Sequence, residues 1–233
     1  DKSQSCFIYS LDIPSGLNGL SGKAEPDAVP AHATVTFQAA KCGLAMPGAE
    51  SYTGHLHIRD IGIPLAVRRA YPPGLHLLDN SLAKVASPWP RDMHKGTAGR
   101  TLVVGGSEGL TGAPVLAALA ACRAGAGLVT VAYPGALRTE MSLGRPEIMT
   151  LALGQGTEWD PDAAKQLAAS LSNYDSLVIG PGMGRTIEAA QVLEHLLSAI
   201  RPPAVLDADA LWCLKRHPKL LDLLSPSDIL TPH

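Results

Sequence analysis

The strongest constraint on the fold is a regular alternation of short apolar runs and longer helical patterns over residues 101–230. This alternation is typical of parallel strands joined by crossover helices. We therefore predict an α/β sandwich whose loops gather at the carboxyl ends of the strands. The predicted strands are 101–104, 128–132, 148–153, 176–179, 204–206 and 228–230, and the predicted helices are 113–124, 136–142, 162–172, 186–200 and 210–216.

The beginning of the chain has a different sequence pattern. Apolar, β-rich runs at 6–11, 33–37 and 55–61 predict three strands, and Pro14 and Gly16 force a turn after the first of them. Between 64 and 100, prolines are scattered among polar residues with no sustained period. We therefore predict one domain at 1–66, a linker at 67–90 and a second domain at 91–233.

Composition excludes several classes of protein. With 46% hydrophobic and 17% charged residues, the chain has material for a core, and its net charge of -2 gives no general attraction to nucleic acid or to an anionic membrane. No apolar stretch approaches the roughly 18 residues that a membrane span needs. The four cysteines are far apart and form no Cys-x-x-Cys pair, which predicts reduced core thiols in a cytoplasmic protein: Cys6, Cys42, Cys122 and Cys213.

Two glycine-rich loops carry the main chemical signal. Gly105 to Ala113 follows a buried strand and opens an Ala-rich helix, so its bare backbone N–H groups could hold a phosphate. Gly180 to Arg185 stands in the equivalent place after the strand at 176–179. Neither loop has the spacing of a P-loop or of a Rossmann fingerprint, so tight-turn geometry remains an alternative for each. Both loops are expected at the same edge of the sheet.

Polar residues follow two further strands. Asp207 and Asp209 end the strand at 204–206, and we interpret Asp209 as the cap of the next helix. Asp207 could face a ligand or a phosphate-bound Mg²⁺, although one carboxylate is not a metal site. His233, at the exit of the last strand, could offer an imidazole or be an ordinary surface residue.

These motifs together resemble a known family. Residues 95–233 are similar to NAD(P)H-hydrate dehydratases, which have a ribokinase-like fold. The motifs that carry the resemblance are Lys95 to Arg100, the Gly-Gly-Ser loop, Arg123 to Thr130, Gly180 to Gly184, Asp207 to Leu211 and Thr231-Pro232-His233. Trp212 departs from the pattern, because the family often has Asn there.

The first region resembles the end of NAD(P)H-hydrate epimerases, which have a Rossmann-like fold. The matching motifs are Asp12 to Asn18, Thr34 to Phe37, Lys41-x-Gly43 and Asp60 to Pro64. The family's Asn-rich loop would precede residue 1, and the Gly-Ser-Gly-Asp segment of the dehydratases would follow His233. We therefore expect a fragment of a bifunctional NAD(P)H-hydrate repair enzyme, with little dehydratase turnover when isolated.

The resemblance implies roles for particular residues. In the epimerase region, Asp12 would contact the substrate and Ser15 would help bind K⁺, although a turn-forming hydroxyl is an alternative for Ser15. Lys41 would pair with Asp12 structurally. In the dehydratase region, Ala113, Gly182, Gly184 and His233 would border the hydrate, and the catalytic base would follow His233.

The implied chemistry is repair of hydrated NADH and NADPH (NADHX and NADPHX). The epimerase would interconvert the R and S forms, and the dehydratase would use ADP or ATP, with Mg²⁺ as a possible companion, to remove the hydroxyl of the S form. The sequence leaves homo-oligomerisation open. Two alternatives remain: a ribokinase-like small-molecule kinase, such as a hydroxyethylthiazole-type kinase, and a noncatalytic nucleotide-binding or protein-interaction module.

Overall fold

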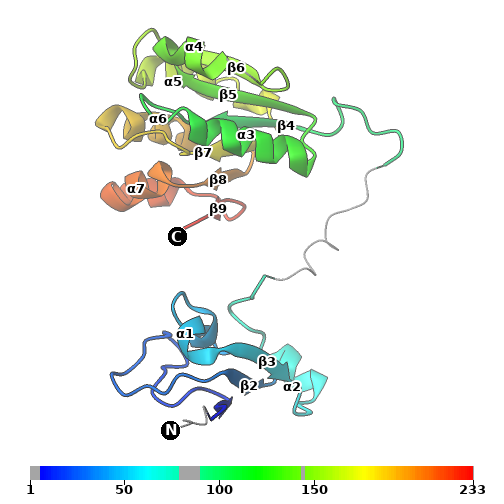
Figure 1. Ribbon diagram of the computed structural model, residues 1–233. Helices are drawn as coiled ribbons and strands as arrows, with labels where there is room; N and C mark the ends of the chain where they lie inside the picture. Colours follow the sequence, from blue (N-terminus) through cyan, green and yellow to red (C-terminus); the bar gives the residue numbers. More distant parts are fainter. Residues whose placement is uncertain (1–5, 79–89, 143–144, 233) are drawn as a thin grey trace. The chain divides into compact units, whose positions relative to one another are not determined.

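The structure, a computed structural model, describes residues 6–78, 90–142 and 145–232. The chain divides into two compact units, unit 1 (Asp1–Pro88) and unit 2 (Trp89–His233), and Figure 1 shows the elements of each. Residues 79–89 of the predicted linker lie outside the described residues.

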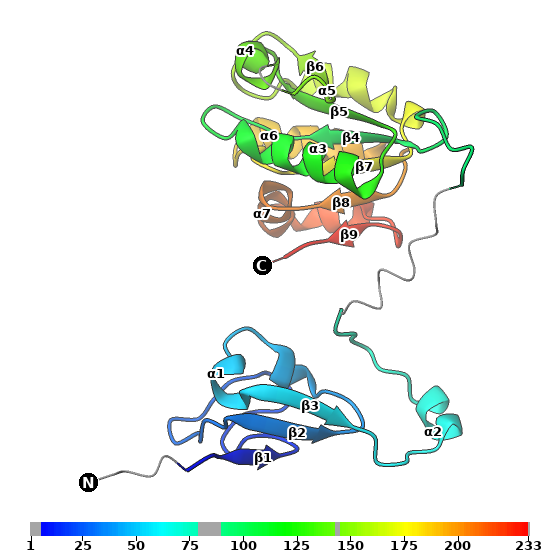
Figure 2. The same ribbon diagram turned by 45° about the vertical axis from the view of Figure 1, so that its right-hand side comes forward.

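Unit 1 is built on a small parallel sheet with the order β1-β2-β3 (Figure 2). The strands are β1 (Tyr9–Leu11), β2 (Ala33–Phe37) and β3 (His55–Arg59), with Tyr9 opposite Ala33 and Ala33 opposite His55. The predicted first strand began at residue 6 and is too long. The side chain of His32 accepts the N–H of Ile8 at 3.0 Å, so ladder pairing starts only at Tyr9.

Short helices complete unit 1: η1 (Cys42–Ala45), α1 (Glu50–Thr53) and α2 (Leu65–Ala70). Helix α2 was not predicted. It buries none of its residues, so it has no apolar face and no periodic signal in the sequence. Its start is fixed locally, since the carbonyl of Pro64 accepts the N–H groups of Val67 and Arg68 at 3.0 and 3.1 Å.

Unit 2 contains a sheet in which every strand is parallel to its neighbours, in the order β6-β5-β4-β7-β8-β9. The strands are β4 (Arg100–Val104), β5 (Leu128–Pro134), β6 (Met149–Leu153), β7 (Ser176–Ile179), β8 (Ala204–Leu206) and β9 (Ile229–Leu230). The predicted parallel α/β sandwich is confirmed.

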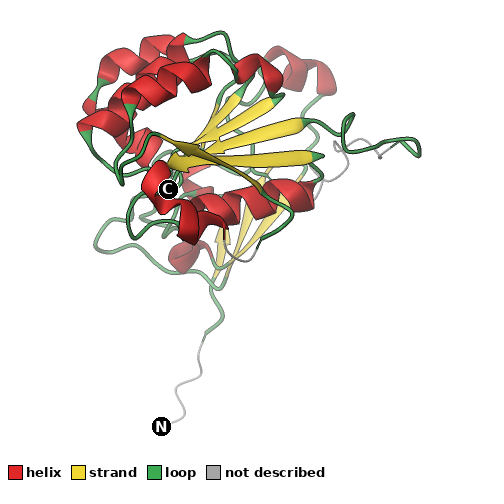
Figure 3. Ribbon diagram, turned by 90° about the horizontal axis from the view of Figure 1, so that it is seen from above, coloured by secondary structure: helices red, strands yellow, loops and turns green. Residues whose placement is uncertain are grey.

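Helices cover both faces of this sheet (Figure 3). They are α3 (Gly112–Ala124), α4 (Arg138–Ser142), α5 (Pro161–Ala168), α6 (Ile187–Ser198) and α7 (Asp209–Arg216), with short turns η3 (Gly135–Leu137), η4 (Leu171–Asn173) and η5 (Pro218–Leu223). In β4, Val103 packs with α3 and α4, whereas Leu102 and Val104 pack with α5, α6 and α7. Burial on both faces explains the unbroken apolar runs in the sequence.

Helix α5 is shorter than predicted. It was expected to continue to residue 172 but ends at Ala168. Both the hydroxyl and the N–H of Ser170 donate to the carbonyl of Leu167, at 2.8 and 2.9 Å, and this local competition replaces the helical bonding pattern.

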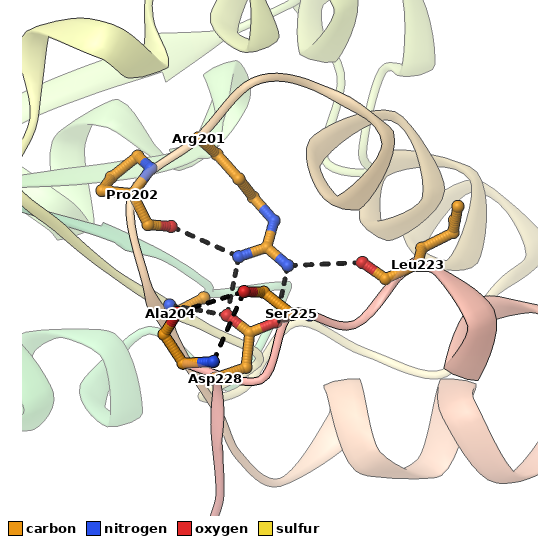
Figure 4. A network of polar contacts seen from close by, with 7 residues as sticks. Arg201, Pro202, Ala204, Leu223, Ser225 and Asp228 are labelled. Carbon is orange, nitrogen blue, oxygen red and sulfur yellow. Dashed lines mark hydrogen bonds and ion pairs between the residues drawn. The ribbon is translucent and has the colours of Figure 1, made fainter.

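A buried ion pair joins the amino ends of β8 and β9 (Figure 4). The side chains of Arg201 and Asp228 are 5% and 2% exposed, and two nitrogens of Arg201 donate to the two oxygens of Asp228 at 2.7 and 2.6 Å. The carboxylate also accepts the N–H groups of Ala204 and Ser225 at 2.9 and 2.8 Å. Asp228, predicted as part of the last strand, therefore anchors that strand and lies just before it.

The cysteines only partly follow prediction. All four are free thiols, but only Cys213 is buried, while Cys6 is exposed and Cys42 and Cys122 are half-buried. The expectation of core thiols is therefore correct for Cys213 alone. Among the described residues, no helix is both long enough and apolar enough to cross a membrane.

Candidate active site

The sheet of unit 2 changes its direction of growth at β4. From β4 the chain adds β5 and β6 on one side, and then β7, β8 and β9 on the other. The loops that leave β4 and β7, at residues 105–111 (the first glycine loop) and 180–186 (the second glycine loop), therefore flank a topological switch point. Ligands of open α/β sheets bind at such a point.

The two glycine loops lie at the same edge of the sheet, as predicted, and are in direct contact. The N–H of Gly106 donates to the carbonyl of Pro181 at 3.0 Å, and the N–H of Gly180 donates to the carbonyl of Val104 at 3.0 Å. A Cβ on Gly105 would lie 2.3 Å from the Pro181 oxygen, so the two backbones approach more closely than any larger residue permits.

Packing explains one predicted ligand-binding glycine but not the other. Gly182 has a φ of +63°, and a Cβ there would lie 2.5 Å from the carbonyl oxygen of Leu110 and 3.3 Å from the Cβ of Ala113. Gly184 has a φ of +85°, but its nearest neighbours, two atoms of Ser107, would lie at 3.5 Å. The tight-turn alternative thus accounts for Gly182, whereas a Cβ on Gly184 would make only an ordinary van der Waals contact with Ser107, so packing alone does not require glycine there.

The loops carry unused hydrogen-bond donors on a fixed frame. Among the described residues, the N–H groups of Ser107 and Gly182 have no acceptor. The second glycine loop is held by the indole of Trp159, which is 2% exposed and donates to the carbonyl of Met183 at 2.8 Å. Backbone donors held in this way can bind a phosphate or another anionic oxygen without reorganisation.

Asp209 does not cap helix α7, contrary to prediction. The cap position is Ala208, which has a φ of +48° and no side-chain acceptor, and Asp209 is the first helical residue. Its carboxylate instead accepts the N–H of Gly184 and the Nε of Arg185, both at 2.9 Å. Asp209 is 7% exposed and ties the second glycine loop to the end of β8.

The exits of β8 and β9 also carry polar side chains. Asp207 accepts the hydroxyl of Thr231 at 2.7 Å, so the exits of β8 and β9 are linked. No group of three or more His, Cys, Asp or Glu that could hold a metal occurs in the part of the chain that the structure describes. His233 lies outside the described residues.

Unit 1 has a polar site of its own at the carboxyl end of β1. Asp12, with a φ of +67°, accepts the hydroxyl of Thr36 at 3.1 Å and the N–H of Phe37 at 3.2 Å. The Nζ of Lys41 donates to the same carboxylate oxygen and to the carbonyl of Phe37. The predicted pairing of Lys41 with Asp12 is confirmed.

These contacts fix the charge of Asp12. The hydrogen bond from Lys41, followed by that from the N–H of Phe37, lowers the pKa of Asp12 below its usual value of 3.8. At neutral pH the group is therefore a carboxylate that accepts hydrogen bonds. Its side chain is 40% exposed, so it remains open to a ligand.

Lys41 also lines a hollow of about 440 Å³, together with residues that include Gln38, Ile58 and His76. Ser15 lies after β1 on the exposed turn that Pro14 begins. Its backbone carbonyl accepts the N–H of Val29 at 2.9 Å, and no hydrogen bond of its hydroxyl occurs among the described residues.

Comparison with known proteins identifies unit 2. The family model of NAD(P)H-hydrate dehydratase matches residues 101–233, which include both glycine loops and the exits of β8 and β9. The chain belongs to the NAD(P)H-hydrate dehydratase family. A second model, the YjeF-related protein N-terminus, matches residues 2–43, which include Asp12 and Lys41.

Curated relatives of this family match nearly the whole chain. The bifunctional NAD(P)H-hydrate repair enzymes Nnr of Moorella thermoacetica and Salinibacter ruber are 39% and 37% identical, over 96% of this chain in each case. The chain spans 43% of the length of each.

Solved structures show the same fold. A ribokinase-like superfamily protein of Enterococcus faecalis superposes with a TM-score of 0.52 at 24% identity, covering 63% of this chain and 49% of that one. A hypothetical protein of Streptococcus mutans gives a TM-score of 0.50 at 30% identity, over 58% and 48% of the two chains. The predicted ribokinase-like fold is thereby confirmed.

Within this dehydratase frame, the structure brings together Ala113, Gly182 and Gly184 at the two glycine loops. Sequence reasoning missed two residues of the same edge. Trp159 is far from the loops in sequence, and only the fold places its indole under Met183. Arg185 could have been found from the sequence, since it is a basic residue that directly follows the glycine run. Its partner Asp209, however, had been predicted to cap a helix.

Proposed function

We propose that the full-length protein repairs hydrated nicotinamide nucleotides, and that unit 2 dehydrates S-NADHX or S-NADPHX with ADP or ATP. The observation that carries this proposal is the pair of glycine loops, which meet at the switch point of a sheet of the dehydratase family and leave backbone donors free. Their N–H groups suit the anionic oxygens of a phosphorylated ligand.

The chemistry requires positioning and charge stabilisation. Hydroxide is a poor leaving group, so the hydroxyl oxygen of the hydrate first attacks the terminal phosphorus of the nucleotide and gives up its proton to a base. The bond from that phosphorus to the bridging oxygen breaks, and ATP leaves as ADP, or ADP as AMP. Phosphate then leaves with the electron pair of the C–O bond, a proton is lost from the ring, and the dihydropyridine is restored. In this proposal Ala113 and Gly184 border the hydrate, His233 bonds it, and donors such as the N–H of Gly182 stabilise developing charge.

Unit 1 is proposed to epimerise the R and S hydrates, so that both become substrates for unit 2. Asp12 supports this proposal because it is a partly exposed carboxylate at a strand end, oriented by Lys41 and Phe37, and its partner Lys41 lines a hollow. Its lowered pKa keeps it ionised, which suits a group that accepts a hydrogen bond from the hydrate.

The proposal includes cations only as ions bound by side-chain oxygen atoms. The exposed hydroxyl of Ser15 is the proposed K⁺ ligand. Asp207, at the exit of β8, is the carboxylate proposed to approach a nucleotide-bound Mg²⁺, and it already accepts a hydrogen bond from Thr231. No step of the reaction is assigned to either ion.

The decisive experiment is an assay of the full-length protein on separated R- and S-NADHX and R- and S-NADPHX, with ADP, with ATP and without nucleotide. We expect nucleotide-dependent conversion of the S forms to NADH and NADPH, and nucleotide-independent interconversion of R and S. Phosphorylation of an unrelated small alcohol with no action on the hydrates would instead identify a kinase.

A first prediction separates ligand contact from backbone strain at Gly184. Replacement by Val places a branched side chain beside Ser107 of the first glycine loop, where the hydrate is proposed to bind, so we expect hydrate affinity to fall by about tenfold or more. The positive φ should also cost about 1–2 kcal/mol of stability.

Gly99 provides the matched control. It has a φ of +83°, and a Cβ there would also meet its nearest atom, an oxygen of Asp175, at 3.5 Å, but it precedes β4 and so lies at the opposite edge of the sheet. Gly99→Val should lose similar stability and keep hydrate affinity. Equal affinity for the hydrate in Gly184→Val and the unaltered protein would show that the loop is structural only.

A further inference from the structure

Arg185 is a charged residue of the glycine-loop edge to which the proposed reaction assigns no task. Its Nε donates to Asp209 at 2.9 Å, and the other carboxylate oxygen of Asp209 accepts the N–H of Gly184 at 2.9 Å. Because Asp209 is only 7% exposed, the acceptor that holds Arg185 is part of the folded core. The guanidinium is therefore directed by the tertiary structure.

A second contact restricts its rotation. The guanidinium carbon of Arg185 lies 5.9 Å from the centre of the Trp212 ring, and Arg216 approaches the same ring at 5.7 Å. Stacking on an aromatic face favours one orientation of the planar guanidinium. The guanidinium of Arg185 is thus hydrogen-bonded to Asp209 along its inner edge, and one of its faces lies against the ring of Trp212.

The outer edge of the guanidinium remains available. The side chain of Arg185 is 64% exposed, and among the described residues neither Nη group has a hydrogen-bond partner. The two Nη groups carry four of the five N–H donors of arginine, in a planar fork that matches two oxygens of a phosphate. An arginine held on its inner edge loses little further freedom when it binds such a group.

We infer that Arg185 binds a phosphate group of the ligand at the glycine loops, through its two Nη groups. This inference rests on the proposed function, which supplies two sources of phosphate: the hydrate, with its diphosphate and the 2′-phosphate of NADPHX, and the nucleotide. Asp209 already balances part of the positive charge of Arg185. The planar geometry of the guanidinium therefore contributes more to phosphate binding than its net charge does. Lysine should therefore be a poor replacement.

The test measures equilibrium dissociation constants of NADHX and NADPHX without nucleotide, and of ATP and ADP without hydrate, in the full-length protein. Arg185→Gln and Arg185→Lys should weaken at least one phosphate ligand by about tenfold or more. Arg216→Gln, which removes the other guanidinium over Trp212, should change each constant by less than about twofold. The ratio of the dissociation constants of Arg185→Gln and the unaltered protein should decrease as the salt concentration is raised, because salt screens the charge of Arg185. A variant that only loosened the loop would not show this salt dependence.

The pattern of losses identifies the phosphate. Weaker binding of both hydrates assigns Arg185 to the diphosphate, weaker binding of NADPHX alone assigns it to the 2′-phosphate, and weaker binding of ATP and ADP assigns it to the nucleotide. Dissociation constants that stay unchanged in Arg185→Gln, or that rise equally in Arg216→Gln, overturn the inference and leave the proposed function intact. An unaltered protein that binds neither hydrates nor nucleotides overturns both.

Discussion

Asp12→Ala is expected to reduce interconversion of the R and S hydrates by about 10²-fold or more, because it removes the carboxylate that Lys41 and Phe37 hold in place and that is proposed to contact the hydrate. Dehydration of the S form should remain within about twofold of its original rate, since Asp12 belongs to unit 1 and the glycine loops to unit 2. The measurement is the time course of both reactions on separated epimers, followed by chromatography and absorbance.

A matched control is available on the same sheet of unit 1. Asp60 follows β3, and its carboxylate is 61% exposed and 3.7 Å from Arg68, so it resembles Asp12 in position but lacks the bonds to Lys41 and Phe37. Asp60→Ala should leave both activities largely unchanged. If Asp12→Ala lowered epimerisation and dehydration equally, the assignment of two separate sites would be wrong.

Asp228→Ala is expected to lower the free energy of unfolding of unit 2 by about 3–5 kcal/mol. The substitution leaves the guanidinium of Arg201, 5% exposed, without its counter-charge, and leaves the N–H groups of Ala204 and Ser225 without an acceptor. Urea unfolding followed by tryptophan fluorescence measures the effect, because Trp159, which is 2% exposed, and Trp212, in helix α7, both belong to unit 2.

Two comparisons make this prediction specific. Asp222→Ala, on the neighbouring turn η5, removes an exposed carboxylate and should change stability by less than about 0.5 kcal/mol. Replacing both Arg201 and Asp228 with apolar residues should cost less than the sum of the two single changes, because no buried charge is then left alone. A loss at Asp228 no larger than that at Asp222 would refute the importance of the pair.

The same pair gives stability a defined pH dependence. Burial raises the pKa of Asp228, but the hydrogen bonds from Arg201, Ser225 and Ala204 outweigh it, so the net pKa lies below the ordinary value of 3.8. The contribution of a carboxylate with a lowered pKa is complete above the unfolded value and is lost as pH falls through the folded one. The stability difference between the unaltered protein and Asp228→Ala should thus be constant near neutrality and shrink below about pH 4.

Local features of the sequence determined most of the architecture. The apolar runs and helix-length spacers predicted the parallel sandwich, because a strand buried on both faces has no polar positions and a parallel neighbour requires a crossover. The glycine loops were predicted at a shared edge because all parallel strands end on the same side. Asp12 was placed at a strand end because Pro14 and Gly16 stop the strand that precedes it.

Only the tertiary structure decided which side chains meet. Arg185 and Asp209 are 24 residues apart, and Arg201 and Asp228 are 27 apart; in sequence each is an ordinary charged residue with many potential partners. The misassigned cap at Asp209 has the same origin, since a carboxylate beside a helix start satisfies the capping pattern whether or not a distant N–H competes for it. Periodicity and turn chemistry are properties of neighbouring residues and can be read along the chain, whereas the pairing of polar groups depends on the order of strands, which brings the exits of β7 and β8 together.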